Sequence, residues 1–403
     1  MSNFDDGNFT GSSGDTFTEV TSRSWFSRIG SSLTGMLIGP LVVLIAIGLL
    51  FWNEGRAVGT ARSLSEGAGR VVSIAASPVD AANEGKLVHV AGPIAVPGRL
   101  RDAAFGIEAE GLRLTRKVEV FQWKETSQSE TRKKLGGGEE TVTTYHYAMD
   151  WTDHPVDGAS FKQPDGHRNP PVNVRGESFA QPRATLGAFA LTPSQIGSLG
   201  ETRARPVTGS DEGAVRRAAG GATPLSVLDG RIHLGFDPMR PRLGDVRISY
   251  EVAQTAEATI VARQAGNGLA AFTTSNGRTI EILRNGRVPA EQVFADAQTE
   301  NTILTWIIRV GGILLLALGF GMLLGPLSVL ADVIPFLGSL IGGVSSMVAF
   351  ALAVLVGSIT IAIAWFAYRP LLSIGLIVAG VAIAYGLRKL GGRKAAAPAA
   401  AGA

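Results

Sequence analysis

The sequence has no cysteine, which excludes a disulfide framework, cysteine-ligated zinc, an iron–sulfur cluster and a thiol nucleophile. Charged residues are also scarce, at 18% of 403 residues against about a quarter in an average soluble protein. The formal net charge of +3 is too small to indicate nucleic-acid binding. Since the apolar share of 45% is ordinary, the shortage of charge must be concentrated in a few segments.

One long uncharged segment lies near the start of the chain. Residues 35–52 are mostly Leu, Ile, Val and Gly, and at about 1.5 Å per residue they reach across the hydrocarbon core of a bilayer. A cleavable signal peptide is the alternative, but its apolar region would be shorter and a small-residue cleavage site would follow it. We therefore predict an uncleaved transmembrane helix over residues 31–52.

The C-terminal part of the chain is almost free of charge. The uncharged run after Asp332 is too long for one span and too short for two comfortable ones, and Pro335 and a Gly-Gly pair interrupt its first third. We predict transmembrane helices over residues 310–331, 345–368 and 370–387, with an interfacial or re-entrant segment over 332–344.

The remaining segments are polar. Residues 53–309 have nearly balanced charge and favour strands, including a long β-hairpin over residues 112–151. Their composition predicts a disordered tail over residues 1–30 and a basic tail over 388–403. Basic residues beside the first and last spans place both termini in the cytoplasm and residues 53–309 across the membrane. The predicted fold class is an α+β membrane protein with four transmembrane helices and a large β-rich extramembrane domain.

The motifs that could carry chemistry are weak. His146 and His154 lie near several acidic residues, but a solvated loop explains them better than a metal site with converging ligands. Ser178 lacks the glycine pattern of a nucleophile elbow, and Gly136–Gly138 precedes two glutamates that would repel phosphate. We predict no catalytic, cofactor-binding or metal site and no enzymatic activity.

Three charged residues at the ends of the spans are candidate membrane-interface contacts: Glu54, Arg56 and Arg369. Three alternatives fit them. Glu54 and Arg369 form an ion pair that locks the helices to the domain, both snorkel toward lipid headgroups, or Arg369 holds the phosphate of an anionic lipid.

The interiors of the spans hold no ionisable residue, which argues against a pump or an ion-coupled transporter. A pore lined by hydroxyls of an oligomer stays open, with Ser345, Ser346, Ser358 and Thr360 as its candidates. Small residues four apart indicate close helix packing within or between subunits, and the candidates are Gly35, Gly39, Gly321, Gly325, Gly338 and Gly342.

Eight short stretches occur in one order along nearly the whole chain. They are Asn53-Glu-Gly-Arg-Ala, Ser63-Leu-Ser-Glu-Gly, Asn83-Glu-Gly-Lys-Leu-Val-His, Leu112-Arg-Leu-Thr-Arg-Lys-Val-Glu-Val-Phe-Gln-Trp-Lys-Glu, Gly166-His-Arg-Asn-Pro, Gly244-Asp-Val-Arg-Ile-Ser-Tyr, Val261-Ala-Arg-Gln and Trp365-Phe-Ala-Tyr-Arg-Pro. In this order they resemble the transmembrane protein 43 (LUMA) family. The resemblance implies one N-terminal span, a large luminal domain, three C-terminal spans and cytosolic ends.

For the animal members, the resemblance implies a protein of the endoplasmic reticulum and inner nuclear membrane that binds emerin and lamins and self-associates, with a channel-related role also proposed. The Ala-, Gly- and Arg-rich, cysteine-free composition indicates a bacterial member, to which nuclear partners cannot apply.

We therefore expect a non-enzymatic scaffold of the bacterial inner membrane, with residues 53–309 in the periplasm. It would self-associate and organise membrane protein complexes or lipid, without a cofactor. Its expected partners are membrane lipids, further copies of the chain and other membrane proteins, and not nucleic acid. The alternative function is a channel or an accessory subunit of a channel or transporter.

Overall fold

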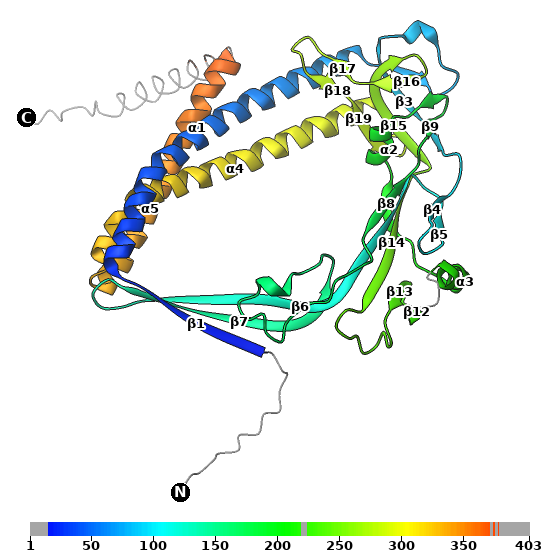
Figure 1. Cartoon of the computed structure of the whole chain (residues 1–403). Helices are drawn as coiled ribbons and strands as arrows, with labels where there is room; N and C mark the ends of the chain where they lie inside the picture. Colours follow the sequence, from blue (N-terminus) through cyan, green and yellow to red (C-terminus); the bar gives the residue numbers. More distant parts are fainter. Residues whose placement is uncertain (1–14, 219–223, 371–373, 375–377, 379–403) are drawn as a thin grey trace, which may run out of the picture.

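Three long helices form one side of the molecule (Figure 1). The computed structural model describes residues 15–218, 224–370, 374 and 378. The helices are α1 (Trp25–Arg70), α4 (Ala290–Ala331) and α5 (Pro335–Tyr368), and each is long and apolar enough to cross a membrane. In their most apolar windows only 17%, 17% and 28% of the residues are buried within the chain. Most apolar side chains of the helices therefore face outward, as expected in lipid.

The helices differ from the predicted spans at several ends. Helix α1 begins before residue 31 and continues well past residue 52, so its second half stands beside the first half of α4 as a two-helix stalk. No separate segment exists over 332–344, because α5 begins at Pro335 and runs unbroken. Proline fits the first turn of a helix, where no hydrogen bond is lost. The predicted span 370–387 lies almost entirely outside the described residues, and the tail 388–403 lies wholly outside them.

Strands and short helices make up the rest of the described chain. The first main sheet contains β1 (Asp15–Arg23), β6 (Arg113–Lys133), β7 (Glu139–Thr152), β8 (Glu177–Ala180), β11 (Glu201–Ala204), β12 (Leu225–Leu228), β13 (Arg231–Leu234) and β14 (Val246–Gln254). The second contains β2 (Val72–Ala75), β3 (Leu87–Ala95), β9 (Thr185–Leu186), β10 (Phe189–Ala190), β15 (Glu257–Ala265), β16 (Gly268–Ala270) and β19 (Ile282–Asn285). The small elements are β4 (Leu100–Asp102), β5 (Ile107–Ala109), β17 (Phe272–Thr273), β18 (Thr279–Ile280), α2 (Pro193–Ser198), α3 (Gly209–Ala218), and the 3₁₀ turns η1 (Ala81–Asn83) and η2 (Gly158–Ser160).

The strand order explains how the sheets hold together. The first sheet runs β1-β7-β6-β14-β13-β12, with β8 also on β6 and β11 on β14. The second runs β19-β15-β16-β10-β9-β3-β2, with β15 also paired to β3. Each sheet has its own hydrophobic core, because alternate residues such as Ile248 and Tyr250 on β14, or Val88 and Val90 on β3, point to one face.

The stalk is fixed to the second sheet by a third core. Leu64 of α1 and Val293 and Phe294 of α4 pack with Leu87 and Val261 of that sheet. Within the apolar half of the helices a fourth cluster joins α1, α4 and α5, formed by Ala46, Leu50, Leu316 and Ala353. The helices and the second sheet are therefore held by ordinary apolar packing.

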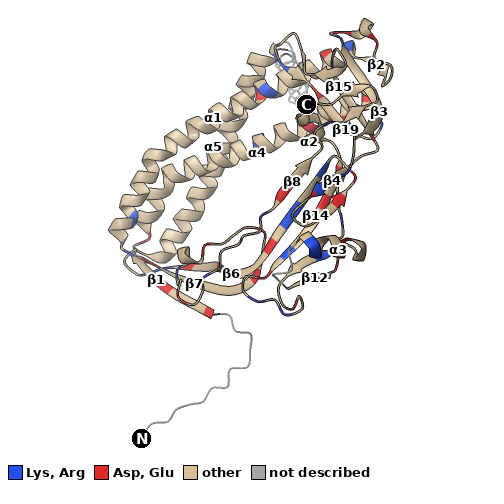
Figure 2. Cartoon of the chain, turned by 45° about the vertical axis from the view of Figure 1, so that its right-hand side comes forward, with Lys and Arg blue, Asp and Glu red and all other residues tan. Residues whose placement is uncertain are grey.

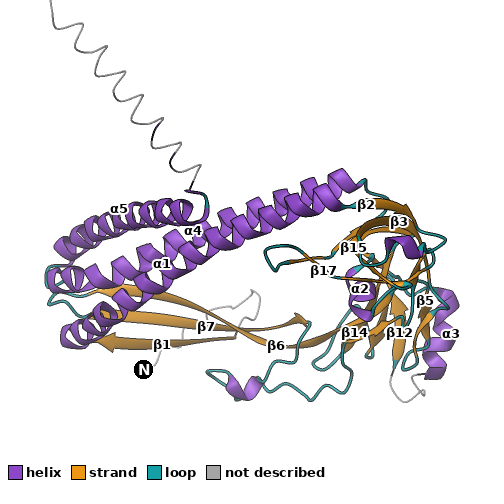
Figure 3. Cartoon of the chain, turned by 90° about the horizontal axis from the view of Figure 1, so that it is seen from above, coloured by secondary structure: helices purple, strands orange, loops and turns teal. Residues whose placement is uncertain are grey.

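The first sheet extends away from its core as a polar ribbon. We use this name for residues 15–23 of β1, 139–147 of β7 and 125–133 of β6, which lie side by side in register, with β7 in the middle. The β6–β7 pairing confirms the predicted hairpin over 112–151. The ribbon runs from the main sheets back to the start of α1 (Figures 1 and 3). Charged residues are frequent on the strands and sparse on the apolar helices (Figure 2).

The ribbon corrects two predictions about the N-terminal segment. Residues 15–30 are a strand and the start of a helix, so the expected disordered tail over 1–30 is wrong for this part. Backbone pairing with β7 orders the strand, although its composition is too polar to form a core. Because residues 15–23 pair with part of 53–309, the bilayer does not separate these two segments as predicted.

Candidate functional site

A buried carboxylate joins the three helices where their apolar halves end. The Glu54 side chain of α1 is only 2% exposed. It accepts hydrogen bonds from Nε and Nη2 of Arg309 on α4, at 2.6 and 2.8 Å, and from Nε1 of Trp365 on α5, at 2.9 Å. A bidentate pair of this kind neutralises both charges where burial makes an unpaired charge costly. We call Glu54, Arg309 and Trp365, with the amide contacts described next, the stalk junction.

Amide and guanidinium groups continue the stalk junction toward the domain. Arg56 donates to the side-chain oxygens of Asn301 and Thr305, each at 3.0 Å, and to Asn53 at 3.2 Å. Asn301 in turn donates to the backbone carbonyl of Ala57 at 3.0 Å. These bonds tie α1 to α4 with polar contacts in the turns that follow the apolar segments.

The structure decides between the sequence-based alternatives for the interface residues. The predicted Glu54–Arg369 ion pair is wrong, because the Glu54 carboxylate pairs with Arg309 instead. Glu54 also does not snorkel toward lipid headgroups, because its side chain is buried. Arg369 follows the end of α5 and lines a cavity of about 250 Å³ together with Glu54, Trp306 and Arg309. Within the described residues no carboxylate lies within ion-pair distance of Arg369. The contact of Arg369 with a lipid phosphate stays a prediction.

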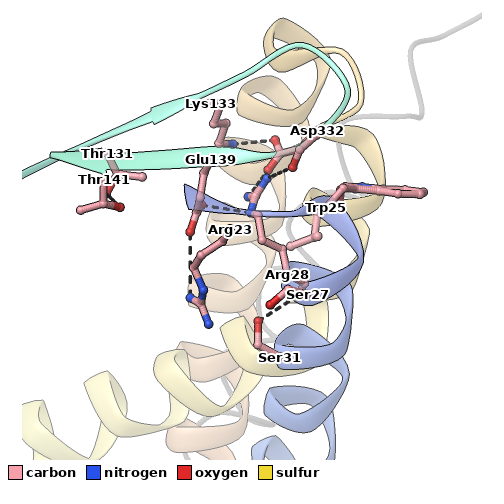
Figure 4. A network of polar contacts seen from close by, with 12 residues as sticks. Arg23, Trp25, Ser27, Arg28, Ser31, Thr131, Lys133, Glu139, Thr141 and Asp332 are labelled. Carbon is pink, nitrogen blue, oxygen red and sulfur yellow. Dashed lines mark hydrogen bonds and ion pairs between the residues drawn. The ribbon is translucent and has the colours of Figure 1, made fainter. Parts of the chain in front are cut away.

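A second network lies at the opposite end of the apolar helices, where the ribbon meets them (Figure 4). Asp332, in the turn between α4 and α5, is buried and accepts hydrogen bonds from Arg28 of α1 and, at 2.6 Å, from Lys133 of β6. Arg28 also pairs with Glu139 of β7 at 3.0 Å. Two acids and two bases thus meet from four elements, and the more exposed Arg23 of β1 lies 4.0 Å from Glu139. We call Arg28, Lys133, Glu139 and Asp332 the ribbon junction.

Backbone contacts complete the ribbon junction. Arg28 donates to the carbonyl of Gly137 at 2.6 Å, and the indole of Trp25 donates to the carbonyl of Val329 at 2.9 Å. The amide of Gly136 donates to the carbonyl of Val333 at 3.2 Å. Gly137 has a φ of +80°, and any side chain there would collide with the Trp25 ring. Only glycine meets both conditions.

Sequence reasoning did not find either junction, although a signal was present. Asp332 is the only charged residue between Arg309 and Arg369, and it was interpreted as the end of a span. A carboxylate isolated in such an apolar stretch needs a cation, and Arg28 and Arg309 both border apolar segments. Which arginine pairs with which carboxylate depends on how the helices pack, and local sequence patterns do not specify that packing.

The six candidate glycines fall into two groups. A methyl group added at Gly39 would lie 2.8 Å from the carbonyl oxygen of Gly319 on α4, so α1 and α4 approach closely there. Gly338 and Gly342 likewise contact the end of α4, at Asp332 and Ser328. The other three have nothing within 4 Å of such a methyl group in the described chain, and they are Gly35, Gly321 and Gly325.

A buried charged network lies in the β-rich part, and its polar groups are satisfied. Asp102 accepts from Arg116 at 2.6 Å and from the hydroxyl of Tyr250 at 2.7 Å, and Arg116 also pairs with Glu177 at 2.9 Å. Burial and the nearby Asp102 carboxylate raise the pKa of Tyr250 far above its ordinary value. Because each group has its partner, the network fits a structural role. Arg116 and Glu177 of this network line a cavity of about 1150 Å³.

The histidines singled out in the sequence are dispersed in the structure. His146 is exposed on β7, His154 is exposed and bonds to the adjacent Asp153, and His167 stacks on Tyr147. Among residues 15–218, 224–370, 374 and 378, no group of three or more His, Asp or Glu side chains is placed to hold a metal ion.

The chain is similar in sequence to known proteins over most of its length. The sequence model of the family "Transmembrane protein 43" matches residues 120–370. Transmembrane protein 43 of Mus musculus is 31% identical over 88% of this chain and 90% of its own length, and that of Homo sapiens is 30% identical over 89% and 90%. The Drosophila melanogaster homolog is 26% identical over 85% and 91%. No solved structure matches. This chain is therefore an integral membrane protein that belongs to the transmembrane protein 43 family.

Proposed function

We propose that this protein is a non-enzymatic membrane scaffold that self-associates and organises membrane protein complexes or lipid. The observation that carries the proposal is the closed frame made by the helices, the main sheets and the polar ribbon (Figure 1). The third core fixes the stalk to the second sheet, and the ribbon junction fixes the ribbon to the far end of the apolar helices. A frame anchored at two points holds long surfaces in a fixed orientation to the membrane, and this is the property that a scaffold requires.

The lipid part of the proposal rests on the cavity at the stalk junction. Arg369 and the indole rings of Trp306 and Trp365 line it, and Trp306 is 58% exposed. Tryptophan and arginine favour the headgroup region of a bilayer. We place the protein in a bacterial inner membrane, with the second sheet and the hydrophobic core of the first sheet on the periplasmic side. We name membrane lipids, other copies of the chain and other membrane proteins as partners.

The test is the native mass of the protein in lipid nanodiscs, with bound lipid retained. We expect a discrete homo-oligomer that carries lipid. A monomer without a protein partner would overturn the scaffold proposal, as would turnover by the purified protein that a single point substitution abolishes.

A channel is a second candidate function, and the polar ribbon favours it. The ribbon carries hydroxyl and charged side chains, and the three apolar helices of the same chain face lipid. A channel requires both, because polar groups must line its pore and apolar groups must face the bilayer. The α5 hydroxyls are less suited, because those of Ser346 and Thr360 donate to carbonyls of their own helix. Conductance in planar bilayers, with an ion selectivity that changes in Glu130→Lys, would support a channel. A silent bilayer would exclude it.

A further inference from the structure

Both long edges of the polar ribbon are free of strand partners in the described chain. β1 pairs only with β7, so its outer edge is open over all nine residues. β14 and β8 pair with β6 no further than residue 120, so the outer edge of residues 125–133 is open as well. The side chain of Asn169 bonds to both backbone groups of Trp123 and closes that edge where the ribbon begins.

The two open edges match each other in length and direction. β1 and β6 both run antiparallel to β7, so they run parallel to each other, and each offers nine residues in the same register. The amides of Phe121 and Trp123 point away from β7. The direction of the backbone amides alternates along each strand of an antiparallel pair. In residues 125–133 the amides of the odd-numbered residues therefore point outward. On β1 the amides of the even-numbered residues, including Thr18, point outward.

Neither edge is interrupted by a proline or a bulge, two of the features that protect natural edge strands. Residues 15–23 and 125–133 contain no proline, and their only lysine is Lys133, which is engaged in the ribbon junction. Lipid cannot satisfy the unpaired backbone groups of an open edge. In water, the same edges are templates for pairing with another strand.

We propose that the ribbons of neighbouring copies pair edge to edge, β1 of one copy with residues 125–133 of β6 in the next. This inference rests on the self-association in the proposed function and names the surface that produces it. The occupant is a second copy because one chain presents both edges with equal length and parallel direction. The interface is head-to-tail, so it repeats from copy to copy and can close into a ring.

Charge indicates the register of this pairing. A pairing without stagger would place Asp15 level with Glu125, and Arg23 level with Lys133, so like charges would meet at both ends. A stagger of two residues toward the junction removes both conflicts. It places Asp15 opposite Ser127 and brings Glu19 diagonally next to Lys133.

Engineered cysteines test the proposal cleanly, because the chain has none of its own. The double variant T18C/E130C matches the staggered register, and T18C/Q128C and T18C/T126C cover the other registers. Each variant is oxidised in nanodiscs and run on a non-reducing gel. Within one chain the β1 and β6 positions are separated by β7, about 10 Å, which is beyond the reach of a disulfide. We therefore expect a ladder of dimers, trimers and higher species for at least one pair.

Two controls accompany the double variants. Thr18 and Thr144 are direct partners on β1 and β7, so T18C/T144C should oxidise within the chain and run as a monomer. The single variants should give no ladder, and a strong dimer from T18C alone would overturn the head-to-tail pairing. A Thr18→Pro substitution, which removes an outward amide, should shift the native mass toward the monomer.

The outcomes separate this inference from the proposed function. A discrete oligomer whose edge positions never cross-link overturns the edge pairing and leaves the scaffold proposal standing. A monomer in the native mass spectrum overturns both. A ladder together with an oligomer of fixed size supports both.

Discussion

The stalk junction and the ribbon junction lie at opposite ends of the apolar helices, and they differ in the residues that surround their charged side chains. At the stalk junction, Glu54 and Arg309 join helices that already pack through the clusters around Leu50 and Leu64. At the ribbon junction, the hairpin tip reaches the helices with no buried hydrophobic cluster between them in the described chain. Ion pairs, the Trp25 indole and backbone hydrogen bonds hold it, together with the pairing of β7 with β1, which leads into α1.

This difference shows that one kind of interaction can have two structural roles. Where packing already fixes the geometry, a buried ion pair mainly avoids the cost of an unpaired charge. Where packing is absent, the same kind of pair determines whether two elements meet. Substitutions at the two junctions should therefore differ in where their effect appears, as well as in its size.

The largest effect is expected for Asp332→Asn. It leaves Arg28 and Lys133 without their shared carboxylate in a buried site, which should cost about 5 kcal/mol of unfolding free energy. Hydrogen exchange should rise in residues 125–147 and stay unchanged in β3. The matched control is Glu130→Gln, whose exposed pair with Arg132 should contribute nothing measurable to stability. Unchanged exchange in the ribbon of the Asp332 variant would contradict the role assigned to this junction.

Glu54→Gln should come next, with a loss of about 3 kcal/mol, because Arg309 becomes an unpaired buried cation. Thermal unfolding in detergent measures the loss, and ribbon exchange should not change. Adding Arg309→Met should recover part of the stability, since both charges are then gone. If the ribbon loosened in Glu54→Gln, the two junctions would not be independent.

A smaller effect is expected between the junctions, where helices α1 and α4 touch. Gly39→Ala should cost about 1–3 kcal/mol, because its methyl group meets the backbone of Gly319. Gly321→Ala is the matched control, since nothing in the described chain lies near its added methyl group. Equal melting temperatures for the two variants would argue against close packing of α1 and α4 at this point.

The smallest effect on stability is expected for Arg369→Gln, which breaks no ion pair within the described residues. It should instead lower the amount of anionic phospholipid that co-purifies by several-fold, measured by native mass spectrometry. Arg132→Gln, an exposed cation in the ribbon, is the control and should retain its lipid. Equal lipid content in both variants would contradict the proposed binding of lipid at the stalk junction.

The sequence predicts the apolar helices and the β-hairpin well, because both follow from local patterns. Apolar length and the lack of charge reveal α1 and α4, and alternating β-branched and aromatic residues reveal β6 and β7. The pairing of β1 with β7 is not local. It joins residues more than a hundred positions apart, and the composition of residues 15–23 indicates disorder when they are considered alone.

The candidate site shows the same limit. The sequence identifies Glu54 as an interface residue but gives it the wrong partner, since Arg369 and Arg309 border neighbouring spans with the same charge. Helix packing places α4 beside α1 along most of its length, and that contact selects Arg309. The buried position of Asp332 likewise depends on the hairpin tip, whose destination no local pattern encodes.

The ribbon junction also determines when the molecule can be completed during synthesis. Arg28 and Asp332 are 304 residues apart in the chain. Their ion pair can therefore form only after α4 and the turn that follows it have been synthesised. β1 is translated first among the ribbon strands, and its partner β7 follows only after α1 has been made. The frame is therefore closed late, by segments from both ends of the chain, and a ribosome that stalls before residue 332 leaves it open.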